Sequence, residues 1–436
     1  MTPTRRLLHF TLAWCLLGAA ASLFGGPWPA AWAVAGSLLA AIALADLLLL
    51  RLEKVPRARR RLPGRLALGV ETEVILTLIN PLRRRLQTEW IDGVPPAAEA
   101  PGQPAVVVLA PESETELAYP LRALERGTLA LGRTWLRVRS RFGLWRRRHL
   151  AGENCEVRVF PNYEPIVRFS LLAMSHRESQ MGIHLLNRRG GSREFHQLRE
   201  YHDGDALSQV DWKASARRLQ LISREYREQR HQTVVMAIDC GRRMRALDGE
   251  LPQFDHCLNA ALLLSFIALR QGDYAGVLGF GGDDPRWLPP VRGTHSMPVL
   301  LNHLHDYQAG LQPSDFLEAA ERIQQFQRRR ALVVLLTNLR SEDQSDLAAA
   351  VRLLARRHLV VVASLTEASA EALAWHPVGQ FDQALAAAAA HRYLGERKAV
   401  LEHLSGCGAL LVDQPAQRLP IALCNRYLDI KAGGRL

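Results

Sequence analysis

The sequence predicts a multidomain membrane protein with a two-helix transmembrane hairpin, an antiparallel β-sandwich and a doubly wound α/β domain. Two apolar runs stand near the N-terminus, period-two alternation follows them, and apolar strands then alternate with helical patterns. The 436 residues suit two or three domains. We expect the hairpin in residues 1–55, the sandwich in 65–161, a polar connector in 162–232 and the α/β domain in 233–436.

The hairpin is predicted by two apolar stretches, Leu7 to Phe24 and Trp28 or Ala30 to Leu50. Each has roughly 18–22 residues, enough to cross the hydrocarbon core of a bilayer. The Gly-Gly-Pro-Trp-Pro sequence at 25–29 breaks the helix between them. The alternative is a cleaved signal peptide, but a second full-length apolar run and a basic cluster follow the first run.

Basic residues bracket the hairpin and predict its orientation. Arg5 and Arg6 precede the first run, and only Glu53 opposes the cluster after the second run. That cluster consists of Arg51, Lys54, Arg57, Arg59, Arg60, Arg61 and Arg65. The positive-inside rule then puts both termini and the soluble domains in the cytoplasm, with the hairpin in the inner membrane.

The charge and the cysteine content limit which classes of function the chain can have. Lys and Arg number 55 against 43 Asp and Glu, a formal charge of +12, which excludes an acidic solvating protein. Nucleic acid is not an expected partner, because no aromatic residues interleave the basic cluster to stack on bases. The six cysteines are scattered without a Cys-x-x-Cys pair, a pattern that suits a reducing compartment.

Residues 65–161 alternate between apolar and polar side chains with Gly and Pro between the runs. Residues 70–79 alternate and end at Asn80-Pro81, and residues 115–121 alternate before a Gly-containing turn. Short strands at such spacing predict an antiparallel sandwich of immunoglobulin-like type. The run 146–149 is basic and is interpreted as a solvated or membrane-facing edge.

The connector concentrates carboxylates, guanidiniums and aromatic rings. Three interpretations are open: an ion-pair cluster that docks the segment on the next domain, a partner-binding surface, or an active site with paired acids or a metal. Abundant arginines and two histidines without ligand spacing, His196 and His202, argue against the last. The candidate residues are Arg199, Glu200, Tyr201, Asp205, Asp211, Trp212, Arg217, Arg224 and Glu225.

The stretches Arg199-Glu200-Tyr201, Gly204-Asp205, 210–217 and Arg224-Glu225 resemble the signature of the bacterial DUF58 family. The resemblance extends over essentially the whole chain, including the hairpin, a strand domain with Arg-Gly and Phe-Gly-Leu elements, and the α/β domain. It implies a role beside a MoxR-type AAA+ ATPase in the assembly or maturation of other complexes. It implies no enzymatic reaction.

Apolar strands alternate with helical patterns from residue 233 onward. Strands are predicted at 233–239, 273–280, 331–336, 359–364 and 409–412. Helices are predicted at 254–271, 294–304, 315–326, 343–356, 381–404 and 417–428. Such alternation predicts a parallel sheet covered on both faces, with ligands at the carboxyl ends of its strands.

The order of these elements resembles a von Willebrand factor type A domain. That family holds a divalent metal with Asp-x-Ser-x-Ser after the first strand, plus a Thr and an Asp from later loops. Here only Asp239 matches, because Gly241 and Arg243 replace the hydroxyls and Asn338 stands near the later Asp position. We therefore expect a lost or weak metal site, with Asp239 pairing with Arg243 or capping a helix.

The function predicted is that of a membrane-anchored cytoplasmic adaptor without catalytic activity or cofactor. No Gly-Lys-Ser/Thr phosphate loop and no Gly-x-Ser-x-Gly elbow occur in the sequence. The alternative function is divalent-metal-dependent ligand binding through the α/β domain, with Mg²⁺ held by Asp239.

Overall fold

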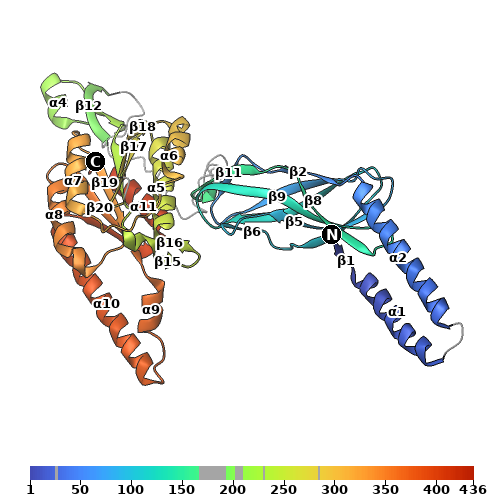
Figure 1. Ribbon diagram of the computed structural model, residues 1–436. Coiled ribbons are helices and arrows are strands. Elements are labelled where there is room, and N and C mark those ends of the chain that lie inside the picture. Colours follow the sequence, from blue (N-terminus) through green and yellow to red (C-terminus); the bar gives the residue numbers. More distant parts are fainter. Residues whose placement is uncertain (25–27, 166–192, 202–209, 229–230, 283–284) are drawn as a thin grey trace. The chain divides into compact units, whose positions relative to one another are not determined.

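The computed structural model describes residues 1–24, 28–165, 193–201, 210–228, 231–282 and 285–436 (Figure 1). The chain forms two compact units, Met1–Phe160 and Pro161–Leu436. Each unit has its own sheets and its own buried side chains.

The first unit begins with β1 (Thr2–Pro3) and two helices that lie side by side, α1 (Arg5–Phe24) and α2 (Trp28–Leu52). The rings of Trp14 and Trp32 stack with their centroids 4.5 Å apart. Each indole donates to the other residue's carbonyl, at 3.1 Å from Trp14 and 2.9 Å from Trp32. A Cβ on Gly18 would meet the Trp32 ring at 2.5 Å, and Gly36 meets Trp14 in the same way. The two glycines thus let the rings fit between the helices.

Within the described residues, one helix is long and apolar enough to cross a membrane. It is α2, with 25 residues and a mean hydropathy of 2.3 in its most apolar window. Only 17% of that window is buried against the rest of the protein. This helix near the N-terminus is consistent with membrane anchoring, and the second predicted span stays a prediction.

A buried carboxylate joins α2 to the β-sheets of the first unit. Asp46 accepts hydrogen bonds from the Ser140 hydroxyl at 2.5 Å and from the amides of Phe142 at 3.0 Å and Leu144 at 3.3 Å. The indole of Trp145 donates to the carbonyl of Ala43 at 2.8 Å. The end of α2 is therefore fixed to the turn between two strands.

Two sheets form the β part of the first unit. The seven-stranded sheet contains β1, β10 (Trp145–Ala151), β9 (Gly127–Arg139), β11 (Cys155–Phe160), β3 (Arg65–Ala67), β5 (Leu86–Gly93) and β7 (Ala105–Leu109). The four-stranded sheet contains β2 (Arg57–Arg61), β4 (Glu71–Ile79), β8 (Glu114–Ala123) and β6 (Ala98–Glu99). The pairs are antiparallel except β11 with β3. Alternate residues of β4 are fully buried, as its period-two pattern predicts.

An ion pair spans the two sheets. Asp92 of β5 is buried and binds Arg60 of β2, with 2.8 Å between Nε and Oδ2. Tyr119 of β8 and Thr134 of β9 also donate to the Asp92 carboxylate. Burial alone would raise the pKa of Asp92. The hydrogen bonds from Arg60 and Tyr119, together with the guanidinium charge, outweigh burial and hold that pKa below its ordinary 3.8.

The second unit is built on a six-stranded sheet. Its strands in spatial order are β18 (Arg286–Arg292), β17 (Tyr274–Phe280), β14 (Thr233–Asp239), β19 (Leu332–Thr337), β20 (Leu359–Thr366) and β21 (Leu410–Pro415). All neighbours are parallel except β18, which is antiparallel to β17. The predicted parallel sheet thus gains an antiparallel edge strand that the sequence analysis did not identify.

Helices cover both faces of this sheet. They are α5 (Gln253–Arg270), α6 (Met297–Leu304), α7 (Phe316–Phe326), α8 (Gln344–Ala355), α11 (Leu419–Ala432) and the C-terminal half of α10 (Phe381–Gly406). The short helix α9 (Ala368–Ala374) packs mainly against α10. Leu262 of α5, Leu300 of α6 and Leu423 of α11 belong to one apolar core. Ile323 of α7 and Val351 of α8 belong to the other. Successive residues of β14 and β19 point alternately into the two cores, as strand geometry requires.

Short elements complete the second unit. They are the strands β15 (Leu247–Asp248) and β16 (Leu251–Pro252), and the 3₁₀ turns η3 (Arg242–Arg245), η4 (Thr294–Ser296) and η5 (Ser341–Asp343).

The predicted connector folds in part into a hairpin with a helix between its strands. β12 (Arg193–Glu200) pairs antiparallel with β13 (Ile222–Glu228), and α4 (Trp212–Arg218) precedes β13. Residues 166–192, which include Gly190 and Gly191, and residues 202–209 of the connector lie outside the described residues.

Candidate functional site

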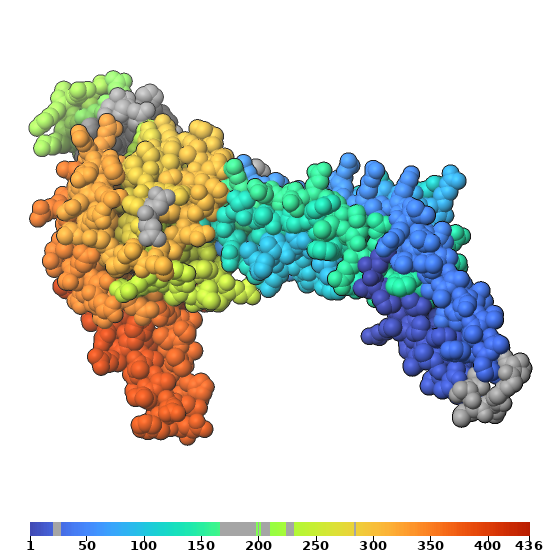
Figure 2. Space-filling model, viewed as in Figure 1, coloured from blue at the N-terminus to red at the C-terminus, as the bar shows by residue number. Residues whose placement is uncertain are grey.

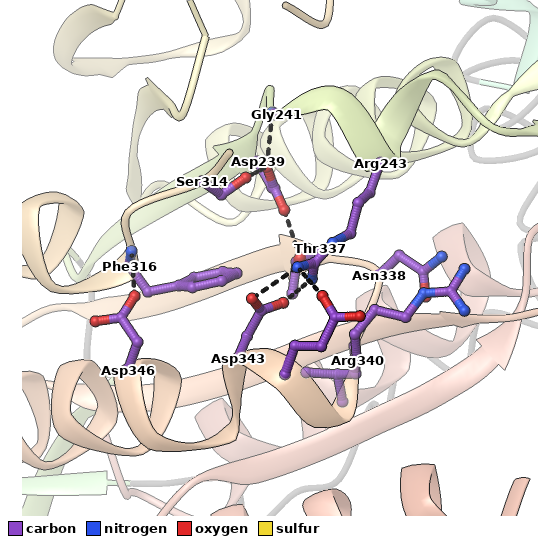
Figure 3. Close-up of polar contacts among 12 residues, drawn as sticks. Asp239, Gly241, Arg243, Ser314, Phe316, Thr337, Asn338, Arg340, Asp343 and Asp346 are labelled. Carbon is purple, nitrogen blue, oxygen red and sulfur yellow. Dashed lines mark hydrogen bonds and ion pairs between the residues drawn. The ribbon is translucent and has the colours of Figure 1, made fainter. Parts of the chain in front are cut away.

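The carboxyl end of β14 carries the residue that the sequence analysis singled out for metal binding. Asp239 is buried, and both of its oxygens accept hydrogen bonds (Figure 3). The amide of Gly241 donates to Oδ1 at 2.8 Å, and the Ser314 hydroxyl donates to the same oxygen. The hydroxyl of Thr337, the last residue of β19, donates to Oδ2 at 2.6 Å. The carboxylate thus ties three chain segments together.

Electrostatics distinguish this carboxylate from an exposed one. Burial raises the pKa of Asp239, and the hydrogen bonds from Ser314, Thr337 and Gly241 offset that rise only in part. The positive charge of Arg243 also lowers the pKa, but it acts from a distance because its guanidinium is bound elsewhere.

Arg243 does not form the predicted pair with Asp239. Its Nη2 lies 2.9 Å from Oδ1 of Asp343 and 3.1 Å from Oε2 of Glu342, and a second bond joins Nη1 to Asp343. Asp343 stands at the end of η5, just before α8. The side chain that replaces a hydroxyl of the metal-binding pattern therefore holds a neighbouring loop, as Figure 3 shows.

Asn338 is committed to other contacts. Its Nδ2 donates to Oε1 of Gln253 at 2.8 Å and to Oε1 of Glu367 at 2.7 Å. Arg340 donates to the same Glu367 oxygen at 2.6 Å. The position at which the metal-binding pattern has a carboxylate is therefore an amide that bridges α5 and the start of α9.

A buried arginine extends this network across the sheet. Arg397 of α10 donates to the Ser364 hydroxyl at 2.7 Å and to the carbonyl of Leu365 at 2.8 Å, and it also binds Asp413. Its guanidinium lies 3.4 Å from Oδ1 of Asn338. Arg397 thus fixes α10 to the carboxyl ends of three neighbouring strands, β19, β20 and β21.

The residues present do not fit a divalent cation well. Asp239 is a single carboxylate with both oxygens already occupied by donors, whereas hard cations take several oxygen ligands. Within the part of the chain that the structure describes, no group of three His, Cys, Asp or Glu side chains could hold a metal ion. Burial raises the pKa of the nearby Cys257 thiol well above its usual value, which favours the protonated thiol.

The signature residues divide into structural and exposed ones. Asp211 caps α4 by accepting from the amide of Ala214 at 3.0 Å, and Glu200 accepts from Gln220 at 2.9 Å. Tyr201 is half-buried, whereas Trp212 and Arg217 of α4 are exposed.

The remaining signature residues lie on the hairpin or outside the described residues. Arg224 pairs with Leu198 across the β12–β13 hairpin, Arg199 pairs with Ser223, and Glu225 pairs with Gln197. Asp205 lies outside the described residues.

Two residues of this polar network give no signal in the sequence. Ser314 is 75 positions away from Asp239, and Arg397 lies in an Ala-rich helix that shows no motif. Their roles depend on contacts through space, and no spacing rule would have found them.

Several solved structures are similar to part of the chain. Salmonella alpha-2-macroglobulin reacted with methylamine is 23% identical over 24% of this chain, with a TM-score of 0.19, and the match covers 7% of that protein. Proximal thread matrix protein 1 from the mussel byssus is 12% identical over 46% of this chain and 47% of its own, with a TM-score of 0.28. A FixG-related protein from Vibrio parahaemolyticus is 10% identical over 24% of this chain and 98% of its own, with a TM-score of 0.19.

No curated protein matches the chain. The family described as "Protein of unknown function DUF58" matches residues 197–382, which contain the signature, Asp239, Thr337 and Asn338. Residues 197–382 therefore form a domain of the DUF58 family.

Proposed function

We propose that the protein is a membrane-anchored cytoplasmic adaptor that binds a MoxR-type AAA+ ATPase and catalyses no reaction itself. The observation that carries this proposal is a contrast between the buried polar groups and the exposed side chains. The polar groups at the carboxyl edge of the sheet bind one another, whereas the apolar helices and the signature helix α4 expose their side chains.

The anchor in this proposal is a hairpin of α1 and α2 in the inner membrane. Both helices expose large apolar side chains, each worth about 1.5–3 kcal/mol when removed from water. They include Leu8, Phe10, Leu12, Leu16 and Leu17 in α1, and Trp28, Val34, Leu38, Leu44 and Leu48 in α2. A bilayer would cover these side chains while the Trp14–Trp32 contact keeps the helices together.

Charge supports a cytoplasmic location for both units. Arg5 begins α1, and Arg51 lies in the last turn of α2. The strand β2, which follows α2, carries four arginines in five residues, and such clusters stay on the cytoplasmic side.

We infer that the β part of the first unit is an immunoglobulin-like sandwich and that the second unit is von Willebrand factor type A-like. The Asp92 contacts to strands of both sheets support the first inference. The strand order and the antiparallel edge strand β18 support the second. In such a unit Asp239 would tie loops together instead of binding a cation.

The partner surface in this proposal is α4 and the turn at residues 219–221 that follows it. Trp212 is 65% exposed, and Leu219 and Leu221 are also exposed beside the basic residues Lys213 and Arg217. Exposed aromatic and arginine side chains of this kind supply most of the energy at protein interfaces. Asp211 caps the helix, and the Ser215 hydroxyl donates to the carbonyl of Asp211 and accepts from the amide of Ile222. These bonds hold the helix in place for such contacts.

The proposal is tested by purifying the tagged full chain from detergent extracts under native expression. A MoxR-type ATPase should co-purify with the wild type and be lost from a Trp212→Ala, Arg217→Ala variant. Trp135→Ala, which removes an exposed tryptophan from the first unit, is the matched control and should retain the ATPase. A partner set without any AAA+ ATPase would contradict the adaptor role.

The topology has its own test. Protease added to intact spheroplasts should leave both soluble units undigested. Digestion of these units would contradict the cytoplasmic location.

A further inference from the structure

The helices α9 and α10 form a projection from the second unit. Figures 1 and 2 show them side by side, extending beyond the sheet. The C-terminal half of α10 is held by buried residues, among them Arg397, Val400 and Leu404. The N-terminal half leaves the sheet together with α9 and the turn at 375–380.

The end of this projection, residues 373–385, is apolar and exposed, and we call it the α9–α10 tip. All residues from 375 to 385 are exposed. Five large apolar side chains lie there: Leu373 (49% exposed), Trp375 (79%), Val378 (54%), Phe381 (81%) and Leu385 (62%). The ring of Trp375 meets His391 of α10 edge to face at 5.3 Å, so it is held in position while most of its surface stays exposed.

The tip is also poor in charge. Between Ala368 and His391 the sequence has no Lys or Arg, and its acidic residues are Glu371 and Asp382. The chain as a whole is 22% charged. The tip therefore offers neither a basic patch for a negatively charged partner nor an acidic patch for a basic one, and its attraction is apolar.

We propose that the α9–α10 tip inserts shallowly into a lipid bilayer, at the boundary between headgroups and acyl chains. A fluid bilayer accepts a narrow convex projection without needing a complementary groove, and Trp side chains favour this boundary. The same chain carries α2, so anchoring would keep a bilayer at high effective concentration near the second unit. The inference rests on the membrane anchoring proposed above.

The test uses the full chain reconstituted in vesicles of neutral and anionic phospholipid. Phe381 is replaced by the photo-crosslinking residue benzoylphenylalanine, and Leu311, a loop residue of the same unit that is 68% exposed, is replaced in a control chain. Insertion should give a lipid adduct at position 381 at a yield at least about tenfold above that at position 311. Equal yields, or an adduct at 381 with protein only, would overturn the proposal.

A second measurement avoids dependence on the photo-crosslinking variants. The fluorescence difference between wild type and Trp375→Phe isolates the signal of Trp375. If Trp375 lies in the bilayer, its fluorescence should be weaker in vesicles of brominated lipid than in vesicles of unbrominated lipid. Equal Trp375 fluorescence in the two kinds of vesicle would also contradict insertion.

Failure of the tip and failure of the anchor are distinguishable. Alkaline extraction of the same vesicles releases a protein that is not anchored by α1 and α2. Protein that resists extraction but gives no lipid adduct at 381 overturns tip insertion while membrane anchoring stands. Protein that is released by extraction overturns the anchor.

Discussion

The two units bury their key carboxylates in opposite ways. Asp92 of the first unit and Asp239 of the second are both 3% exposed. Arg60 gives Asp92 a full counter-charge, and the pKa of Asp92 is lowered. Asp239 receives hydrogen bonds from two hydroxyls and one amide, and burial raises its pKa. Of these two buried acids, the one that a guanidinium reaches is the one whose pKa is lowered.

The largest effect should come from removing the guanidinium. Arg60→Met leaves Asp92 buried without its counter-charge and should cost the first unit about 3–5 kcal/mol of unfolding free energy. Calorimetry of the full chain in detergent measures this as a lower unfolding temperature. Arg83→Met, which breaks an exposed pair with Glu112, is the control and should cost at most about 1 kcal/mol. Equal losses for the two variants would contradict the role of Arg60.

Neutralising each acid sharpens the comparison. Asp92→Asn leaves the Arg60 guanidinium without its counter-charge and should lower the unfolding free energy by about 3 kcal/mol. Asp239→Asn keeps the shape and an acceptor, so it should cost about 1 kcal/mol or less. Urea unfolding of each variant measures the two losses. A larger loss for Asp239→Asn would mean that the ionised form of Asp239 is better stabilised than its contacts indicate.

The pH dependence should have opposite signs in the two units. The lowered pKa of Asp92 gives stability that is present above 3.8 and is lost as the pH falls below 3.8. The raised pKa of Asp239 makes the folded state bind a proton more tightly than the unfolded state. Its contribution therefore declines as the pH rises from 3.8 through the raised value.

The measurement is the unfolding temperature of wild type and Asp239→Asn, compared across this pH range. The loss of unfolding temperature caused by Asp239→Asn should become smaller as the pH rises and should stop changing once Asp239 is ionised in the folded state. A constant difference between the two proteins would contradict the raised pKa.

The smallest effect should be that of magnesium. If a site bound Mg²⁺ with a dissociation constant one tenth of the added Mg²⁺ concentration, it would raise the unfolding free energy by about 1.4 kcal/mol. We expect no change in unfolding temperature on adding Mg²⁺, either in the wild type or in Asp239→Ala. A stabilisation of the wild type that Asp239→Ala abolishes would restore metal-dependent ligand binding as the function.

Sequence patterns predicted the elements that are apolar and continuous. β14, β19 and β20 were predicted because all-apolar strands of a parallel sheet read as unbroken runs. The edge strand β18 was missed because Pro289 and Pro290 argue against a strand, although an edge tolerates them. The hairpin β12–β13 was missed because its residues are mostly charged.

Sequence patterns place Asp239 and Asn338 of the polar network at the carboxyl edge of the sheet, but they do not identify the contacts of either residue. Asp343, which binds Arg243, lies 100 positions from it in the sequence. Thr337, whose hydroxyl donates to Asp239, lies 98 positions from Asp239. Such pairings follow from the stacking of strands, which periodicity does not encode. The DUF58 signature was identified in the sequence, and the match at residues 197–382 confirms it for that stretch.

The contact of Asp46 with residues 140–144 has a mechanical consequence. Because three donors and the Trp145 indole grip the end of α2, the helix cannot swivel independently of the sheets. Any tilt of α2 in a bilayer would therefore turn the β part of the first unit by the same angle.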